Sequence, residues 1–221
     1  MKIGNQLFTA AGPTAIERAH KRGARVFLDL KYHDIPNTVA GAVREATRLG
    51  VFMLNVHASG GVAMMRAAAE AATKAASDFA VARPIVLGVT VLTSLDRKAL
   101  LHDLGVAASV ESHVLRLAER AHAAGLDGCV ASPREIALLR GALGPRWKIV
   151  TPGVRPGTTR VGGAGGPGEA PRPKDDQARV ATPGAAIRAG ADYLVVGRPI
   201  TAAPDPVAAI RAIVEEITRT P

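Results

Sequence analysis

The 221-residue sequence contains a single cysteine, Cys129, and only 3% aromatic residues. One cysteine cannot form a disulfide within the chain and is typical of a reducing compartment, so we expect a cytoplasmic protein. No apolar run approaches the roughly 18 residues that a membrane span requires. The first residues also lack the long apolar stretch of a signal peptide. With so few aromatics, the core must consist mainly of Ala, Val, Leu and Ile.

Positive charge is in excess, because 28 Lys and Arg stand against 19 Asp and Glu. Such an excess is common in nucleic-acid-binding proteins, but there it gathers in blocks, tails or stripes. Here the basic residues are spread along the chain without a Lys/Arg block. A protein that binds a small phosphorylated molecule also needs positive potential. An Arg-rich, solvent-exposed surface is the simplest explanation of the excess, and we expect no nucleic-acid partner.

Seven short, β-branched apolar runs alternate with longer Ala-rich amphipathic stretches, which predicts an α/β fold with a parallel sheet covered by helices. The length fits one domain, residues 1–221, and the repeat is typical of a TIM (β/α)8 barrel, although that barrel needs eight strands to close. The expected strands are residues 2–4, 25–30, 51–56, 84–91, 128–131, 148–151 and 191–197. The expected helices include residues 14–22, 38–49, 62–77, 110–124, 133–139, 183–189 and 206–218.

One segment, residues 157–176, interrupts this alternation. It is rich in Gly and Pro and has no apolar periodicity. A loop of this length inside a compact domain is usually functional or mobile. We expect it to be a mobile loop that closes over a bound phosphate.

The stretch F-L-D-L-K-Y-H-D-I-P-N-T, residues 27–38, contains the most informative pattern. Residues two apart on a strand point to the same side, so Asp29 and Lys31 are predicted to project together. They lie near the C-terminal end of the strand, where the active sites of such barrels are found. Asp34 follows the strand and belongs to the next loop. Taken alone, this pattern is explained equally well by an ordinary salt bridge at a strand end.

Lys2 adds a second amine to this region. It lies on the preceding strand, in K-I-G-N, and adjacent barrel strands present their last side chains to the same mouth. Two lysines and two aspartates would then form an alternating array of charge. Such an array is costly to assemble unless it has a function.

The sequence G-R-P-I-T near the C-terminus is a candidate phosphate site. Gly197 lets the backbone approach an anion, Arg198 offers a bidentate guanidinium, and Pro199 can begin a short helix. Arg155 and Gln177 are placed to close over the same group. G-R-P is also an ordinary turn, and its place after the last barrel strand is what favours phosphate binding.

Together these segments resemble the orotidine 5′-phosphate decarboxylases of the bacterial type. The similar segments run from residue 2 to about 201 in the family's order: KIGNQLFTAAGP, FLDLKYHDIPNT, MLNVHASGG, GVTVLTS, TPGVRP, DDQARVATP and ADYLVVGRPIT. The resemblance implies a homodimeric (β/α)8 barrel without cofactor or metal. It also implies conversion of orotidine 5′-phosphate to UMP and CO₂, the last step of de novo UMP biosynthesis.

The same resemblance implies the residues that carry out the reaction. Lys2, Asp29 and Lys31 would form the charged array, and Lys31 would protonate C6 after CO₂ leaves. Asp34 and Thr38 would reach across the dimer interface into the site of the other subunit.

Binding of the substrate is assigned in the same way. A hydroxyl of Thr93 or Ser94 would contact the pyrimidine. The residues expected to hold the 5′-phosphate are Arg155, Gln177, Gly197 and Arg198.

The family has one further strand, ending in an Asp that contacts the ribose, before the Lys2 strand. We therefore expect seven strands here, with the first of eight missing. Two alternatives stay open. The missing strand favours a truncated, catalytically inactive barrel that binds nucleotides. A metal-dependent sugar-phosphate decarboxylase or aldolase of the same superfamily shares the D-x-K-x-x-D pattern, but carries a metal-binding Glu where this chain has Lys2.

Overall fold

A curled sheet of seven parallel strands forms the centre of the computed structural model, which describes residues 1–156 and 181–219. The strands follow one another in chain order, and every neighbouring pair is parallel. They are β1 (Lys2–Gly4), β2 (Phe27–Tyr32), β3 (Met53–His57), β4 (Ile85–Val89), β5 (Gly128–Val130), β6 (Lys148–Thr151) and β7 (Tyr193–Leu194). The predicted seven-stranded parallel sheet is therefore confirmed, with each strand inside or overlapping an apolar run.

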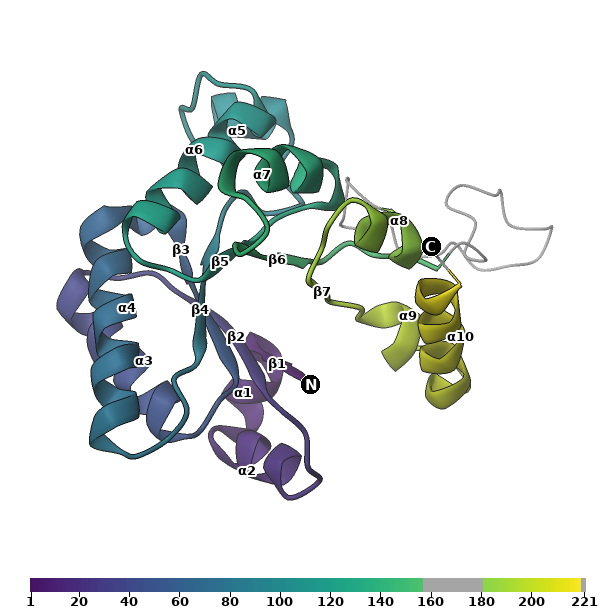
Figure 1. Ribbon diagram of the computed structural model, residues 1–221, viewed down its shortest axis with the longest axis horizontal. Helices are drawn as coiled ribbons and strands as arrows, with labels where there is room; N and C mark the ends of the chain where they lie inside the picture. Colours follow the sequence, from purple (N-terminus) through teal and green to yellow (C-terminus); the bar gives the residue numbers. More distant parts are fainter. Residues whose placement is uncertain (157–180, 220–221) are drawn as a thin grey trace.

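Helices connect the strands and cover the outer face of the sheet (Figure 1). They are α1 (Asn5–Ala11), α2 (Thr14–His20), α3 (Pro36–Arg48), α4 (Gly61–Asp78), α5 (Arg97–His102), α6 (Val110–Ala123), α7 (Ile136–Leu143), α8 (Pro183–Arg188), α9 (Arg198–Thr201) and α10 (Pro206–Thr218). Two single 3₁₀ turns, Ala58–Gly60 and Pro133–Glu135, precede α4 and α7. Among the described residues, no helix combines the length and apolar character needed to cross a membrane.

Most element bounds differ from the expected ones by a few residues; β2, for example, is Phe27–Tyr32 rather than residues 25–30. Helix α3 begins at Pro36 rather than at residue 38, because proline suits the first turn of a helix, where its missing N–H is not needed. Strand β7 is limited to Tyr193–Leu194 instead of residues 191–197. The amides of Asp192 and Val195 still donate to the carbonyls of Ile149 and Thr151, so the backbone follows β6 beyond the regular ladder.

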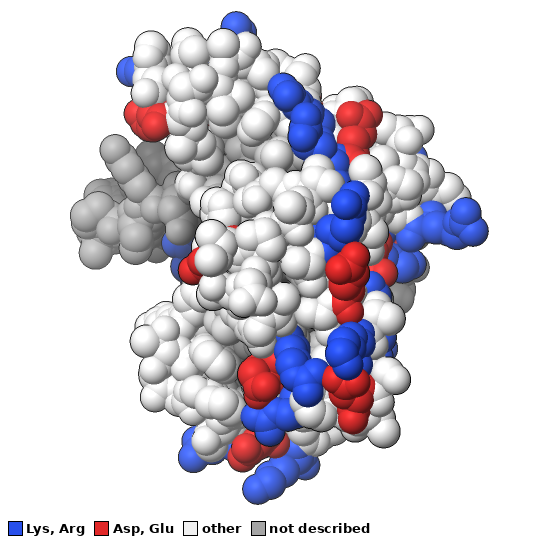
Figure 2. Space-filling view, turned by 90° about the vertical axis from the view of Figure 1, so that its left-hand side faces the viewer, with Lys and Arg blue, Asp and Glu red and all other residues white. Residues whose placement is uncertain are grey.

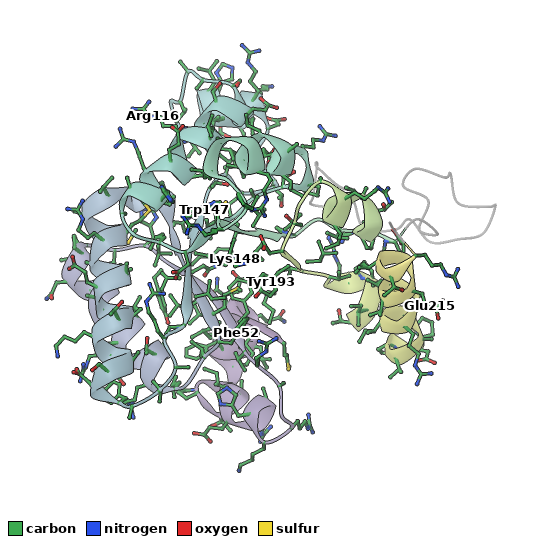
Figure 3. The ribbon with its side chains drawn as sticks, in the orientation of Figure 1. Phe52, Arg116, Trp147, Lys148, Tyr193 and Glu215 are labelled. Carbon is green, nitrogen blue, oxygen red and sulfur yellow. The ribbon has the colours of Figure 1, made fainter. Side chains whose placement is uncertain are left out.

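Apolar side chains form two separate cores, as parallel strands buried on both faces require. The larger core lies between the sheet and its helices and is built mainly from Ala, Val, Leu and Ile. The smaller one fills the concave side of the sheet with Phe27, Met53, Leu87 and Val150. At its margin Phe52 and Tyr193 meet edge to face, with ring centroids 6.1 Å apart (Figure 3). This inner core fills the concave side of the sheet below the C-terminal ends of the strands.

The sheet does not close into a complete barrel within the described residues, because β1 and β7 each pair on one side only. A cavity of about 1090 Å³ is lined by both of these edge strands. Apolar side chains are exposed near this edge, including Leu7 on α1 and Val207, Ile210 and Val214 on α10. A curled sheet with one open side is what a (β/α)8 barrel without its first strand is expected to form.

The outer surface over α3 and α4 carries charges of both signs. Arg44 and Lys74 both pair with Asp78, and Arg48 pairs with Glu45. Figure 2 shows blue and red side chains interleaved down this face. This face therefore lacks the single-sign patch that nucleic acids require.

Asp192 connects the last two strands with α7. Its carboxylate accepts hydrogen bonds from the amide of Ile149 at 2.9 Å and from the guanidinium of Arg140 at 2.7 Å, and it pairs with Lys148 at 3.3 Å. Burial alone would raise its pKa, but these donors hold the pKa of Asp192 below its ordinary value of 3.8. A lowered carboxyl pKa stabilises the fold at all pH values above the ordinary one, and the contribution is lost as the pH falls through the folded value.

We expect Asp192→Asn to lower the free energy of unfolding by about 1–3 kcal/mol at pH 7, because three charge-assisted contacts are weakened together. The difference from the parent chain should shrink as the pH falls below 4, since the parent carboxylate then becomes protonated. Urea unfolding at several pH values measures both effects. Glu45→Gln on the exposed surface is the control and should change stability much less. An undiminished difference in acid would contradict this assignment.

Candidate active site

Three charged side chains from two neighbouring strands meet at the C-terminal end of the sheet. The Asp29 carboxylate lies between two ammonium groups: Lys31 Nζ is 2.7 Å from its Oδ1, and Lys2 Nζ is 3.1 Å from its Oδ2. The Asp29 side chain is 13% exposed, whereas those of Lys2 and Lys31 are 35% and 29% exposed. The structure therefore brings together the three residues of this chain that the sequence placed in one array.

Gly4 explains how Lys2 reaches the carboxylate. Gly4 is the register partner of Asp29 in the β1–β2 ladder. A Cβ atom at Gly4 would lie 2.7 Å from Lys2 Nζ, closer than real Cβ contacts allow. The absence of a side chain at this position leaves space for the ammonium of Lys2 beside Asp29.

The electrostatics of Asp29 follow from these contacts. Burial by itself would raise its pKa, because the charged form loses hydration. Hydrogen bonds from Lys31 and from the Asn55 amide, together with the positive charges of Lys31 and Lys2, hold the pKa of Asp29 below 3.8. Asp29 is therefore ionised at neutral pH and keeps two ammonium groups close together.

The array opens into a cavity of about 550 Å³ on the concave side of the strand ends. Thr93, which follows β4, and the candidate phosphate residues Arg155, Gly197 and Arg198 line the same cavity. Arg198 is the first residue of α9, so the short helix expected after Gly197 is present. Among the described residues, a Cβ atom at Gly197 would meet no atom within 4 Å. One cavity thus contains an acid–amine array and two guanidinium groups.

The remaining expected site residues are not among those that line this cavity. Asp34 and Thr38 are exposed and do not line the cavity; Asp34 Oδ1 accepts a hydrogen bond from the next amide, that of Ile35, at 2.6 Å. Ser94 is also exposed outside the cavity, so Thr93 is the hydroxyl that the fold brings to the site. Gln177 and the expected loop 157–176 lie outside the described residues.

Two polar residues near the array were missed by the sequence reasoning. Asn55 on β3 is fully buried and hydrogen-bonds both to the Asp29 carboxylate and to the amide of Lys31. A polar residue inside the apolar run M-L-N-V-H is the signal that could have identified it. Gln6, on the exposed part of α1, lines the cavity without any sequence signal that singles it out.

His57 ends β3 beside the array. Burial is the main cause that lowers its pKa below 6.5, and electrostatic interaction with His33 and Lys31 lowers it further. Its ring lies 5.3 Å from that of His33. At neutral pH His57 is therefore uncharged and adds no third cation beside the two lysines. In residues 1–156 and 181–219, no three His, Cys, Asp or Glu side chains gather as a metal site.

Comparison with known proteins matches this arrangement to one family. The model of the "Orotidine 5'-phosphate decarboxylase / HUMPS family" matches residues 1–213. The orotidine 5′-phosphate decarboxylase of Moorella thermoacetica is 56% identical over 216 residues, which cover 98% of this chain and 81% of that protein. The corresponding enzyme of Halorhodospira halophila is 53% identical, with 98% of this chain and 84% of that protein covered.

A solved structure of the same family has a similar fold. The crystal structure of orotidine 5′-phosphate decarboxylase from Lactobacillus acidophilus superposes with a TM-score of 0.81 at 36% identity, covering 98% of this chain and 85% of that one. The match thus extends over nearly the whole chain in both sequence and fold. This chain belongs to the orotidine 5′-phosphate decarboxylase / HUMPS family.

Proposed function

We propose that this chain decarboxylates orotidine 5′-phosphate to UMP and CO₂ in pyrimidine biosynthesis, in the cytoplasm and without a cofactor. The observation that carries the proposal is the Asp29 carboxylate held between the ammonium groups of Lys2 and Lys31 inside the 550 Å³ cavity. The named relatives, at up to 56% identity, support the same reaction.

In the proposed reaction, the bond between C6 of the pyrimidine and its carboxylate carbon breaks, and the electron pair stays on C6. CO₂ leaves as this bond breaks. Lys31 Nζ then transfers a proton to C6 and regains a proton from water. A fixed ammonium beside the carbon that becomes negative favours the transition state, because its charge is already oriented when the bond breaks. Asp29 holds that ammonium in place at 2.7 Å.

Two arginines that line the cavity suit the 5′-phosphate. Arg198 can present a bidentate guanidinium to phosphate oxygens, and Arg155 lines the same space. Thr93 lines the same cavity and can contact the base. Binding energy from the phosphate, remote from C6, would orient the pyrimidine against Lys31. Gln177 belongs to the same proposed phosphate site.

We further propose a homodimer in which Asp34 and Thr38 complete the site of the other subunit. Both residues are exposed and lie outside the cavity of their own chain, although they follow β2 directly. Exposed polar groups next to a site, but not in it, are suited to reach a neighbouring copy.

The alternative metal-dependent chemistry conflicts with Lys2. Its ammonium is 3.1 Å from the Asp29 carboxylate, the acidic group that would have to bind the metal. A cation placed there would be repelled by Lys2 and by Lys31. Both lysines instead favour a substrate that is anionic near Asp29.

The direct test is incubation of the purified chain with orotidine 5′-phosphate in the presence of EDTA, following the loss of the orotate absorbance. We expect the absorbance to fall and UMP to accumulate in equal amount. Binding of UMP without any turnover would instead identify an inactive nucleotide-binding barrel.

Lys31→Ala should lower kcat by about 10²–10⁴-fold, the range in which general acids contribute, because C6 loses its proton donor. UMP affinity should change only a few-fold, since the phosphate contacts remain. Steady-state kinetics and calorimetric titration with UMP measure the two quantities. Near-normal kcat in this variant would refute the assignment of Lys31.

Arg198→Ala should mainly lower the affinity for UMP, whereas Lys31→Ala mainly lowers kcat. Loss of charged hydrogen bonds to the phosphate should weaken UMP binding by about 1.5–3 kcal/mol. Arg116→Ala is the matched control, because Arg116 is exposed on α6, away from the cavity (Figure 3). If both variants bind UMP equally well, Arg198 does not hold the phosphate.

The shared site predicts complementation between inactive chains. When Lys31→Ala and Asp34→Ala proteins are refolded together, half of the dimers are mixed, and each mixed dimer has one site free of both changes. We expect about a quarter of the parent activity in the mixture. Activity no higher than that of either variant alone would show that the sites are not shared.

A further inference from the structure

Asn55 is a fully buried polar side chain in the middle of an apolar strand. It lies on β3 between Met53, which belongs to the inner core, and His57 at the strand end. Burying an amide is costly unless its donors and acceptors are satisfied. Both ends of the Asn55 amide group are hydrogen-bonded, and both bonds go to the same short stretch of β2.

The first hydrogen bond is the one that Asn55 accepts from the backbone amide of Lys31. Lys31 has a φ of +54°, in the left-handed region that non-glycine residues rarely adopt. The β2–β3 ladder is irregular between Leu28 and Tyr32, so the Lys31 amide has left the regular strand pairing. Asn55 Oδ1 accepts from this amide at 2.8 Å. The side chain thereby satisfies a backbone donor that the bulge would leave unpaired, and it favours the strained conformation.

The second hydrogen bond is the one that Asn55 donates to the carboxylate of Asp29. Asn55 Nδ2 donates to Oδ1 at 2.8 Å, the same oxygen that Lys31 Nζ approaches to 2.7 Å. Oδ2 is left facing Lys2 at 3.1 Å. The amide therefore fixes the rotation of the carboxylate so that each oxygen faces one lysine.

We infer that Asn55 is a positioning residue for the Asp29–Lys31 pair: its single amide group holds the Lys31 backbone in the left-handed bulge and orients the Asp29 carboxylate. This inference rests on the proposed function for its catalytic consequence. Its structural part, the control of Asp29 by Asn55, does not depend on the substrate.

The test uses two variants of the full chain. Asn55→Ala removes both hydrogen bonds and should lower kcat by about 10–100-fold, the scale of a small misplacement of a catalytic group. UMP affinity should stay within a few-fold of the parent, because Arg155 and Arg198 are unchanged. Thr47→Val is the control, since Thr47 is equally buried but its hydroxyl donates to the carbonyl of Val43 within α3, away from Asp29 and Lys31. Its thermal stability should fall while kcat is retained.

Asn55→Asp keeps the shape of the side chain and gives a pH signature that a purely structural role would not. The new carboxyl can donate to Asp29 only when protonated, so kcat should fall as the pH rises, with a dependence absent from the parent. The groups that face Asp29 are Lys2 on β1, Lys31 on β2 and His57 on β3. His57→Asn in the Asn55→Asp background shows whether the new dependence persists without the imidazole.

Titration of the Asp29 carboxyl by ¹³C NMR separates this inference from the proposed function. In Asn55→Ala the pKa of Asp29 should rise, because one of the donors that lower it is lost. If the parent chain does not turn over orotidine 5′-phosphate, the proposed function fails, and this titration alone decides the inference. Folded Asn55 variants with parental kcat and an unmoved Asp29 titration would overturn it.

Discussion

A carboxylate that is mostly removed from water must be paired with positive charge or with hydrogen-bond donors, and Asp29 obtains these from three adjacent strands. This requirement links the local features of the site. Position 4 is a glycine, and the Lys2 ammonium occupies the space that a side chain there would need. Lys31 adopts a left-handed conformation, and a buried amide on β3 supports it. Each of these features is costly or unusual alone, and together they hold two ammonium groups at one point.

The sheet brings this pairing and the proposed phosphate residues to one cavity. Parallel strands in chain order place all their C-terminal ends at one edge, and the inner core of Phe27, Met53, Leu87 and Val150 closes the floor below. The acid–amine array comes from the first strands, whereas Arg198 follows the last one. The curl of the sheet brings these distant parts of the chain to the same cavity.

Much of the fold and part of the candidate site could be predicted from the sequence, because the periodicity of apolar residues indicates strands and the direction of their side chains. Apolar runs marked the seven strands, and the alternation of side chains placed Asp29 and Lys31 together. Asn55 was missed because its role depends on a bulge in the neighbouring strand, which has no glycine or proline to announce it. The choice of Thr93 over Ser94 likewise depends on how the chain turns after β4. Local pattern predicts strands and faces, whereas tertiary contacts decide which polar groups meet.

The central claim is that the negative charge of Asp29, and not merely its shape, organises the two lysines for decarboxylation. Asp29→Asn tests it most directly, because this substitution keeps the size of the side chain and removes only the charge. The measurement is the rate of orotidine 5′-phosphate decarboxylation at saturating substrate. We expect a loss of about 100-fold or more, the scale at which preorganised charges contribute. A rate within a few-fold of the parent chain would contradict it.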